Sequence, residues 1–179
     1  MTQQKSASAR KSTSASDVLK LLTADHDKVK QLFEEFEELK DKKNSNKKKG
    51  ELVQQICAEL TLHAQAEEAV FYPAAREAID DQDLMDEADV EHAGAKELIA
   101  QLQAMTPEES HYDAKVTVLR EYITHHVKEE ETEMFPKIKK SDMDRQEVAE
   151  GIKHFKEEHE DEIKSFTSSN NRKKDASKA

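Results

Sequence analysis

Two stretches of the chain repeat one pattern: LHAQAEEAVFYP at residues 62–73 and HHVKEEETEMFP at residues 125–136. Each contains a His, a Glu one helical turn later with a second Glu directly after it, and an aromatic residue followed by Pro. So specific a repeat predicts that the chain contains two copies of one structural unit. The composition favours a helical unit, because the sequence has only 3 Gly and 3 Pro residues while 37% of its residues are charged.

Five segments place apolar residues at spacings of three and four, the pattern of an amphipathic helix. The first four stripes are Leu19, Leu22, His26, Val29, Phe33 and Phe36; Leu52, Ile56, Leu60, His63, Glu67 and Val70; Met85, Ala88, His92, Ala95, Ile99 and Leu102; and Leu119, Tyr122 or Ile123, His126, Glu130 and Met134. Each of these four stripes contains one His, and the second and fourth add a Glu one turn after it. The fifth stripe consists of Val148, Ile152, Phe155, His159, Ile163 and Phe166.

Local signals predict where the helices begin and end. Ser and Asp residues cap the first helix, and the basic stretch KNSNKKKG at residues 43–50 predicts a loop before a second helix that begins near Glu51. Thr106 followed by Pro107 predicts the start of the fourth helix. The Pro at the end of each repeated pattern predicts an end or a kink of its helix.

The predicted fold is all-α: an up-down-up-down four-helix bundle, built from two duplicated helical hairpins, plus a C-terminal fifth helix. The bundle is assigned to residues 16–140 and the fifth helix to residues 141–167. Residues 1–15 and 168–179 are basic and poor in apolar residues, so they are predicted to be disordered tails. Packing of two equivalent hairpins brings side chains from all four helices to one level of the bundle.

Polar side chains on the four stripes predict a metal centre at that level. Burying four imidazoles and two carboxylates without partners would cost roughly several kcal/mol. The predicted metal ligands are His26, His63, Glu67, His92, His126 and Glu130. Shared between two metals, they give each metal two nitrogens and, if both carboxylates bridge, two oxygens. This set suits Fe or Mn, leaves Zn or Cu open, and leaves room for a small ligand such as O2, NO or H2O2.

A His and a Glu at this spacing often form only a surface ion pair. A third pair in the chain serves as a comparison for the two repeated ones. His154 and Glu158 have the same spacing, but charged residues and a Gly surround them, so we predict a solvated face there. His125 is one position off its stripe and is predicted to flank the site. His159 is predicted to pack in the core.

Four acidic residues adjoin the predicted ligands: Asp25, Glu68, Glu91 and Glu131. A metal-bound imidazole usually donates its second N–H to a carboxylate or carbonyl, so these residues either orient the imidazoles or face solvent. Tyr72 and Tyr122 are the redox-capable aromatic residues nearest the predicted ligands. Tyr122 lies one turn before a predicted ligand and either packs or faces the site.

Charge and composition exclude several classes of protein. The net charge is −11, and the acidic body between the basic ends argues against nucleic acid as a partner. The chain has no apolar run of the roughly 20 residues that a membrane span needs. Its one Cys and the lack of a secretory signal at its start favour a cytoplasmic protein.

The chain resembles the hemerythrin-like (HHE cation-binding) family, bacterial type, over about residues 17–140. The resemblance rests on DHDKV around His26, HAQAEEAVFYP from His63, EHAGAKEL around His92 and HVKEEETEMFP from His126. It implies a non-haem di-iron centre in a four-helix bundle, with two Fe ions joined by an oxo or hydroxo bridge and Mn or Zn less favoured. The same six residues would be the ligands, and Glu67 and Glu130 would be the bridging carboxylates.

One departure from the family bears on function. Oxygen-carrying hemerythrins have a further His one turn after the third-helix ligand, where this chain has Lys96. The pattern is nearer that of bacterial domains associated with NO, peroxide and iron–sulfur repair chemistry. The predicted function is binding or reduction of O2, NO or H2O2 in oxidative or nitrosative stress defence. The alternative is an iron- or oxygen-sensing or iron-handling module without turnover, and the sequence does not decide whether the protein is an enzyme. The fifth helix is a candidate contact for a protein partner or a second copy of the chain.

Overall fold

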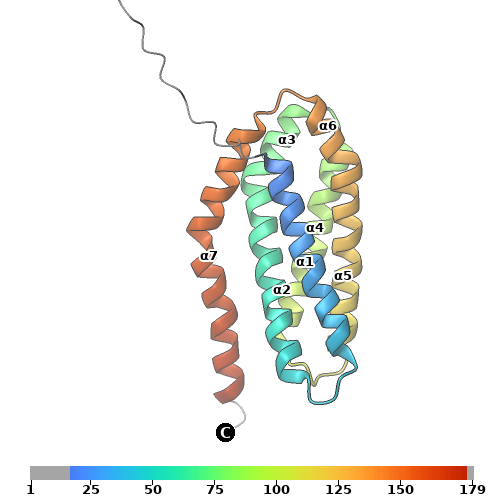
Figure 1. Cartoon of the computed structure of the whole chain (residues 1–179), viewed down its shortest axis with the longest axis vertical. Helices are drawn as coiled ribbons and strands as arrows, with labels where there is room; N and C mark the ends of the chain where they lie inside the picture. Colours follow the sequence, from blue (N-terminus) through green and yellow to red (C-terminus); the bar gives the residue numbers. More distant parts are fainter. Residues whose placement is uncertain (1–16, 177–179) are drawn as a thin grey trace, which may run out of the picture.

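Four long helices form an antiparallel bundle (Figure 1). The computed structural model describes the backbone of residues 17–176 and the side chains of residues 17–161, so the predicted tail 1–15 lies outside the described residues. The long helices are α1 (Val18–Lys40), α2 (Asn46–Ala66), α4 (Gln82–Ala104) and α5 (Tyr112–Glu129). They alternate in direction, which confirms the predicted up-down-up-down bundle. Within the described residues, no helix combines the length and apolar character needed to cross a membrane.

The repeated pattern forms the same local structure twice. A π-helical turn follows α2 as η1 (Glu67–Phe71) and leads into α3 (Tyr72–Ala78), while η2 (Glu130–Met134) follows α5 and leads into α6 (Phe135–Lys140). In each turn a backbone N–H donates to a carbonyl five residues back, from Tyr72 to Glu67 and from Phe135 to Glu130. The Pro that follows lacks an N–H and its ring would clash with the carbonyl four residues back. The wider turn accommodates the Pro, so the chain stays helical where an end or a kink was predicted.

The second long helix begins earlier than predicted. α2 begins at Asn46, inside the basic stretch expected to be a loop. The Ser45 hydroxyl donates to the carbonyls of Leu39 (3.0 Å) and Lys42 (2.7 Å), which closes the preceding turn. Lys49 is only 5% exposed and its ammonium lies 2.9 Å from a carboxylate oxygen of Asp113 on α5. This contact between distant segments stabilises the first turn of α2, and no local propensity indicates it.

The fourth long helix begins later than predicted. α5 begins at Tyr112 rather than after Thr106. The Thr106 N–H donates to the Glu109 carboxylate (2.7 Å), and the Glu109 N–H donates to the Thr106 carbonyl (3.0 Å). These bonds form an isolated turn, and the chain then passes through a positive φ of 69° at His111 before the helix begins. The capping residues at Thr106 therefore close a turn and do not start a helix.

The fifth predicted helix is α7 (Arg145–Ala176), which lies outside the bundle beside α2 (Figure 1). It begins after Asp144, whose carboxylate accepts from the N–H groups of Gln146 (3.1 Å) and Glu147 (3.0 Å). Its backbone continues into the predicted tail 168–179, because no Gly or Pro follows Gly151 to end the helix. Gly151 allows a close approach, since a Cβ there would lie 2.9 Å from Val70 Cγ1 on η1.

The core consists of two apolar clusters. One contains Val18, Leu22, Phe71, Met85, Phe135, Ile138 and Ile152 among its buried residues. The other contains Val29, Phe36, Ile56, Leu60, Ile99 and Leu119. Along each long helix, the predicted ligand His lies between the residues of one cluster and those of the other. The polar residues therefore occupy a layer that divides the bundle in two.

Docking of α7 can be tested through Ile152, which is fully buried at 0% exposure. We expect Ile152→Ala to lower the free energy of unfolding by about 2–5 kcal/mol, because it leaves a cavity between α7 and the bundle. The measurement is urea unfolding of the chelator-treated protein. His154→Ala, at a side chain that is 73% exposed on the same helix, should change stability by no more than about 0.5 kcal/mol. Equal effects of the two substitutions would show that α7 is not docked in solution.

Candidate metal centre

The six side chains predicted as ligands converge in the layer between the two apolar clusters. Their exposed fractions are all below a tenth: His26 6%, His63 7%, His92 4%, His126 4%, Glu67 0% and Glu130 1%. One His comes from each long helix, and each Glu is the first residue of a π-helical turn. The two hairpins therefore contribute equivalent sets of one His from the first helix and a His and a Glu from the second.

Each carboxylate lies between an imidazole of its own hairpin and one of the other. One oxygen of Glu67, Oε2, lies 3.1 Å from His63 Nε2 and 3.5 Å from His92 Nε2. Oε2 of Glu130 lies 3.3 Å from His26 Nε2 and 3.7 Å from His126 Nε2. This crossed arrangement is what two bridging carboxylates between two cations would require.

The donor atoms fall into two groups, each compact enough for one cation. The first group is His26, His63, Glu67 and Glu130, and the second is Glu67, His92 and His126. Within each group the donor atoms all lie within 4.8 Å of one another. Glu67 belongs to both groups. Each hairpin thus supplies the imidazole pair of one group.

The outer nitrogen of every imidazole meets a carboxylate. Nδ1 lies 2.9 Å from a carboxylate oxygen in the pairs His26–Glu131, His92–Glu68 and His126–Glu91, and 3.3 Å from one in the pair His63–Asp25. In each pair the carboxylate comes from a different helical element than the His. All four acidic residues that the sequence left open between orienting an imidazole and facing solvent therefore contact an imidazole. Asp25 and Glu91 contact the imidazole of another helix, not that of the neighbouring residue.

These outer contacts fix the tautomer of each neutral ring. An ionised carboxylate only accepts hydrogen bonds, so each Nδ1 carries the proton and each Nε2 of a neutral ring directs a lone pair inward. Among the described residues, several inward atoms are buried without a hydrogen-bond partner: His26 Nε2, His63 Nε2, both oxygens of Glu67 and Oε2 of Glu130. Lone pairs that face one another without a proton repel, and a cation between them removes the repulsion. The residues present therefore fit a metal centre.

Burial and mutual repulsion also shift the acidity of these groups. Burial, reinforced by Glu130, raises the pKa of Glu67 well above its ordinary value. Burial would do the same to Glu130, but the imidazoles of His126 and His26 outweigh it and lower its pKa to about 2. Burial lowers the pKa of His63 to about 4, so this ring is neutral at physiological pH. A neutral imidazole and an ionised carboxylate are the forms that bind metal.

Of the two Tyr residues that the sequence indicates as nearest the site, Tyr72 belongs to it. The Tyr72 hydroxyl donates to Glu130 Oε1 (3.0 Å) and lies 3.1 Å from His92 Nε2, whereas Tyr122 is 45% exposed. Burial and the nearby carboxylates raise the pKa of Tyr72 well above its ordinary value. In the other hairpin the same position is Phe135, whose ring stacks on that of His26 with the ring centroids 6.1 Å apart. The sequence marks this position by an aromatic residue before Pro in both repeated patterns. The direction in which the aromatic side chain points depends on the π-helical turn, which the sequence did not predict.

The other His residues lie away from this layer. His154 and Glu158 are exposed and their charged atoms lie 3.7 Å apart. His125 has a side chain that is 61% exposed, and its Nε2 lies 3.2 Å from Glu129 and 3.3 Å from Glu91, the outer carboxylate of His126, so it flanks the site without entering it. His159 stacks on Phe155 with ring centroids 4.1 Å apart. The structure thus separates these side chains from the six predicted ligands.

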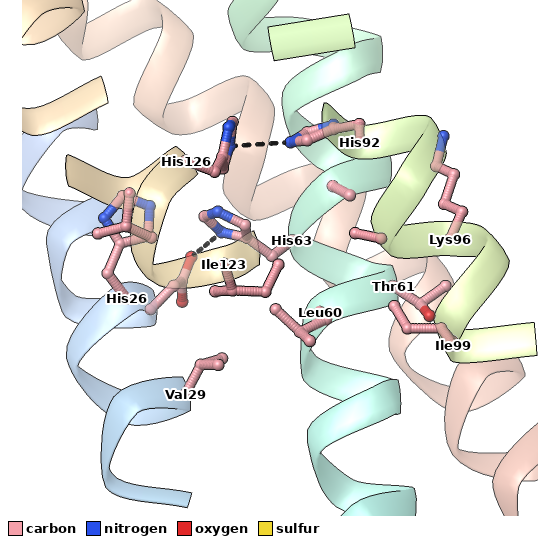
Figure 2. A pocket seen from close by; sticks show the side chains of 14 residues that line it. His26, Val29, Leu60, Thr61, His63, His92, Lys96, Ile99, Ile123 and His126 are labelled. Carbon is pink, nitrogen blue, oxygen red and sulfur yellow. Dashed lines mark hydrogen bonds and ion pairs between the residues drawn. The ribbon is translucent and has the colours of Figure 1, made fainter. Parts of the chain in front are cut away.

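A small apolar cavity adjoins the imidazoles. Its volume is about 30 Å³. Its apolar walls are Val29, Leu60, Ala64, Ala95, Ile99, Ile123 and Val127. Figure 2 shows the four imidazoles toward one end of this space and Val29, Leu60 and Ile99 toward the other. The cavity offers a small, weakly polar molecule a place beside the inward Nε2 atoms.

Comparison with known proteins agrees with this geometry. A curated relative, a DNA nickase from Nostoc sp., is 33% identical over 123 residues, which cover 69% of this chain and 33% of that protein. The chain therefore spans about a third of the relative's length. A crystal structure of a hemerythrin HHE cation-binding domain-containing protein from Mycobacterium kansasii superposes with a TM-score of 0.64 and 19% identity, covering 86% of this chain and 89% of that one. This likeness shows a shared fold.

The family profile described as the hemerythrin HHE cation-binding domain matches residues 17–138. The match includes both repeated patterns and every residue of the buried polar layer. The chain therefore belongs to the hemerythrin HHE cation-binding domain family.

Proposed function

We propose that this hemerythrin-like protein binds two iron ions in the buried polar layer and that the centre binds or reduces a small molecule: O2, NO or H2O2. The observation that carries the proposal is the convergence of four inward Nε2 atoms on two buried carboxylates, of which both oxygens of Glu67 and Oε2 of Glu130 lack a hydrogen-bond partner among the described residues. When bound, iron supplies the affinity for the small ligand and the capacity for electron transfer.

The residues would divide the two ions between the hairpins. His26 and His63 would hold one ion, and His92 and His126 the other. Glu67 would bridge the two ions, because it already contacts one imidazole of each pair. Glu130 makes the equivalent contacts from the other hairpin and would be the second bridge. The carboxylates at the outer nitrogens keep each ring in the tautomer that presents Nε2 to the metal.

The cavity supports a small, weakly polar ligand. Its volume of about 30 Å³ suits a diatomic molecule or peroxide and is too small for a larger substrate. The Tyr72 hydroxyl keeps one proton beside Glu130 on the side of His92. The other hairpin, with Phe135 at the same position, has no such donor.

The cellular location, the role in stress defence and the partners of this protein stay predictions. The nickase activity of the curated relative is not proposed for this chain, because the match covers a third of that protein and this chain is acidic. A cytoplasmic role in oxidative or nitrosative stress defence agrees with the single Cys and the small-ligand cavity. If the protein held two iron ions without consuming peroxide or NO, the sensing or iron-handling alternative would replace this proposal.

Removing one ligand tests the centre directly. We expect His63→Ala and Glu67→Ala to lower iron from about two ions per chain to one or none, because both would take donors from a shared site. The measurement is elemental analysis of purified protein, together with the optical spectrum before and after addition of peroxide. His154→Ala removes a His with the same Glu spacing on the surface and should keep both ions. Retention of two ions by both site variants would sink the ligand assignment.

The raised pKa of Glu67 generates a prediction for the metal-free protein. Since folding raises this pKa above its ordinary value of 4.5, the stabilising protonated form is fully present below pH 4.5 and is lost as the pH rises toward the folded-state pKa. Glu67→Gln cannot ionise, so wild-type protein should become progressively less stable than the variant as the pH rises from 4.5 toward neutrality. Urea unfolding of both chelator-treated proteins over a pH series measures the difference. A difference that does not change with pH would contradict a raised pKa at Glu67.

Filling the cavity should slow ligand binding without removing metal. Ile123→Trp places a larger side chain in the space that the ligand would occupy. We expect the rate of NO binding to fall about tenfold or more, which corresponds to an added barrier of about 1.4 kcal/mol. Stopped-flow absorbance measures this rate, with iron content checked in parallel. Val118→Trp, at an exposed position of the same helix, is the matched control. Identical rates in both variants would show that the ligand does not use this cavity.

A further inference from the structure

Two of the four outer carboxylates in the metal centre bind a Lys. Glu68, which contacts His92, also lies 2.5 Å from the Lys96 ammonium. Asp25, which contacts His63, also accepts from the Lys156 ammonium. One imidazole of each hairpin, His63 or His92, is therefore connected through a carboxylate to a Lys.

The two Lys residues come from different parts of the fold. Lys96 lies on α4, one turn after His92, and belongs to the bundle. Lys156 lies on α7, which is the one long helix of the described chain outside the bundle. The contact of Lys156 with Asp25 therefore connects an added helix to a predicted metal ligand.

We infer that Lys156 is a positioning residue of the metal centre, and that through Asp25 it fixes the His63 imidazole and makes α7 part of the site. This inference rests on the proposed di-iron function. It assigns α7 a role that neither the family match at residues 17–138 nor the four-helix bundle contains.

The shared oxygen gives the contact its effect on the ring. Asp25 Oδ2 is the atom that accepts from both the Lys156 ammonium and His63 Nδ1. A carboxylate that is hydrogen-bonded to a cation is held in one orientation, which keeps its oxygen aligned with a second donor. Lys156 therefore sets both the direction of the His63 ring and the strength of its outer hydrogen bond.

The packing of α7 places Lys156 for this contact. Ile152, one turn earlier on α7, is fully buried in the apolar cluster beside the site. Gly151 lies against Val70, within the π-helical turn that begins with Glu67. Lys156 itself has a side chain that is only 20% exposed. Its ammonium is held at the surface of α1 by the docking of the whole helix.

The inference predicts that the two halves of the centre respond to different Lys residues. Lys156→Met should alter the environment of the ion held by His26 and His63, and Lys96→Met that of the ion held by His92 and His126. Mössbauer spectra of ⁵⁷Fe-loaded protein measure both ions separately. We expect one quadrupole doublet to shift in each variant and the two variants to shift different doublets, with iron content unchanged. Lys156→Arg keeps the charge and a hydrogen-bond donor and should restore the parent spectrum.

A second measurement does not depend on iron. In chelator-treated protein, the ring Nδ1–H of His63 should exchange with solvent about fivefold faster or more in Lys156→Met, which is the size expected for one weakened hydrogen bond. Lys96→Met should accelerate exchange at His92 instead. Nitrogen-15 NMR of the imidazole N–H groups gives both rates in one sample.

A double-mutant cycle shows whether Lys156 acts through Asp25. In an Asp25→Asn background, Lys156→Met should cause no further change in either measurement, because the intermediate carboxylate is already gone. Additive effects of the two substitutions would overturn the inference, as would an unchanged spectrum and exchange rate in Lys156→Met. Failure of the parent protein to bind iron would refute the proposed function, while the NMR exchange rates would still decide the role of Lys156.

Discussion

The burial of two carboxylates opposite four imidazole lone pairs is the constraint on which the rest of the molecule depends. Glu67 and Glu130 are at most 1% exposed, and each accepts no hydrogen bond at Oε2 from the described residues. Such a layer is costly by itself, so it persists only because apolar clusters above and below hold the four helices in place. The outer carboxylates complete the arrangement, since they turn every ring so that Nε2 faces inward.

The duplication of the hairpin explains the symmetry of this layer, and the later differences between the halves explain its asymmetry. Both hairpins supply the same two imidazoles and one carboxylate, at the same positions of the repeated pattern. The surroundings differ: Tyr72 stands where the other half has Phe135. Lys156 on α7 contacts the outer carboxylate of His63, while Lys96 on α4 contacts that of His92. Two ions held here would have the same kinds of ligand but different surroundings.

The sequence was sufficient for the bundle and for the six convergent side chains, because helical spacing and internal repetition are local properties. It was insufficient wherever a distant contact decided the outcome. The start of α2 depends on the ion pair of Lys49 with Asp113, and the start of α5 on a turn closed by Glu109. The orientation of Tyr72 depends on the preceding π-helical turn. The partners of Asp25 and Glu91 lie on other helices, so their place in the sequence did not show which imidazole each contacts.

The two π-helical turns impose a length on the chain as well as a shape. From Glu67 to Pro73 and from Glu130 to Pro136 the interval is the same in both hairpins, although the residues between them differ. An α-helix advances about 100° per residue, so loss of a single residue from either turn would rotate everything beyond it away from the polar layer. Substitutions in these turns can therefore accumulate while insertions and deletions cannot. The spacing between Glu and Pro is therefore a better sequence indicator of this site than the identity of the residues between them.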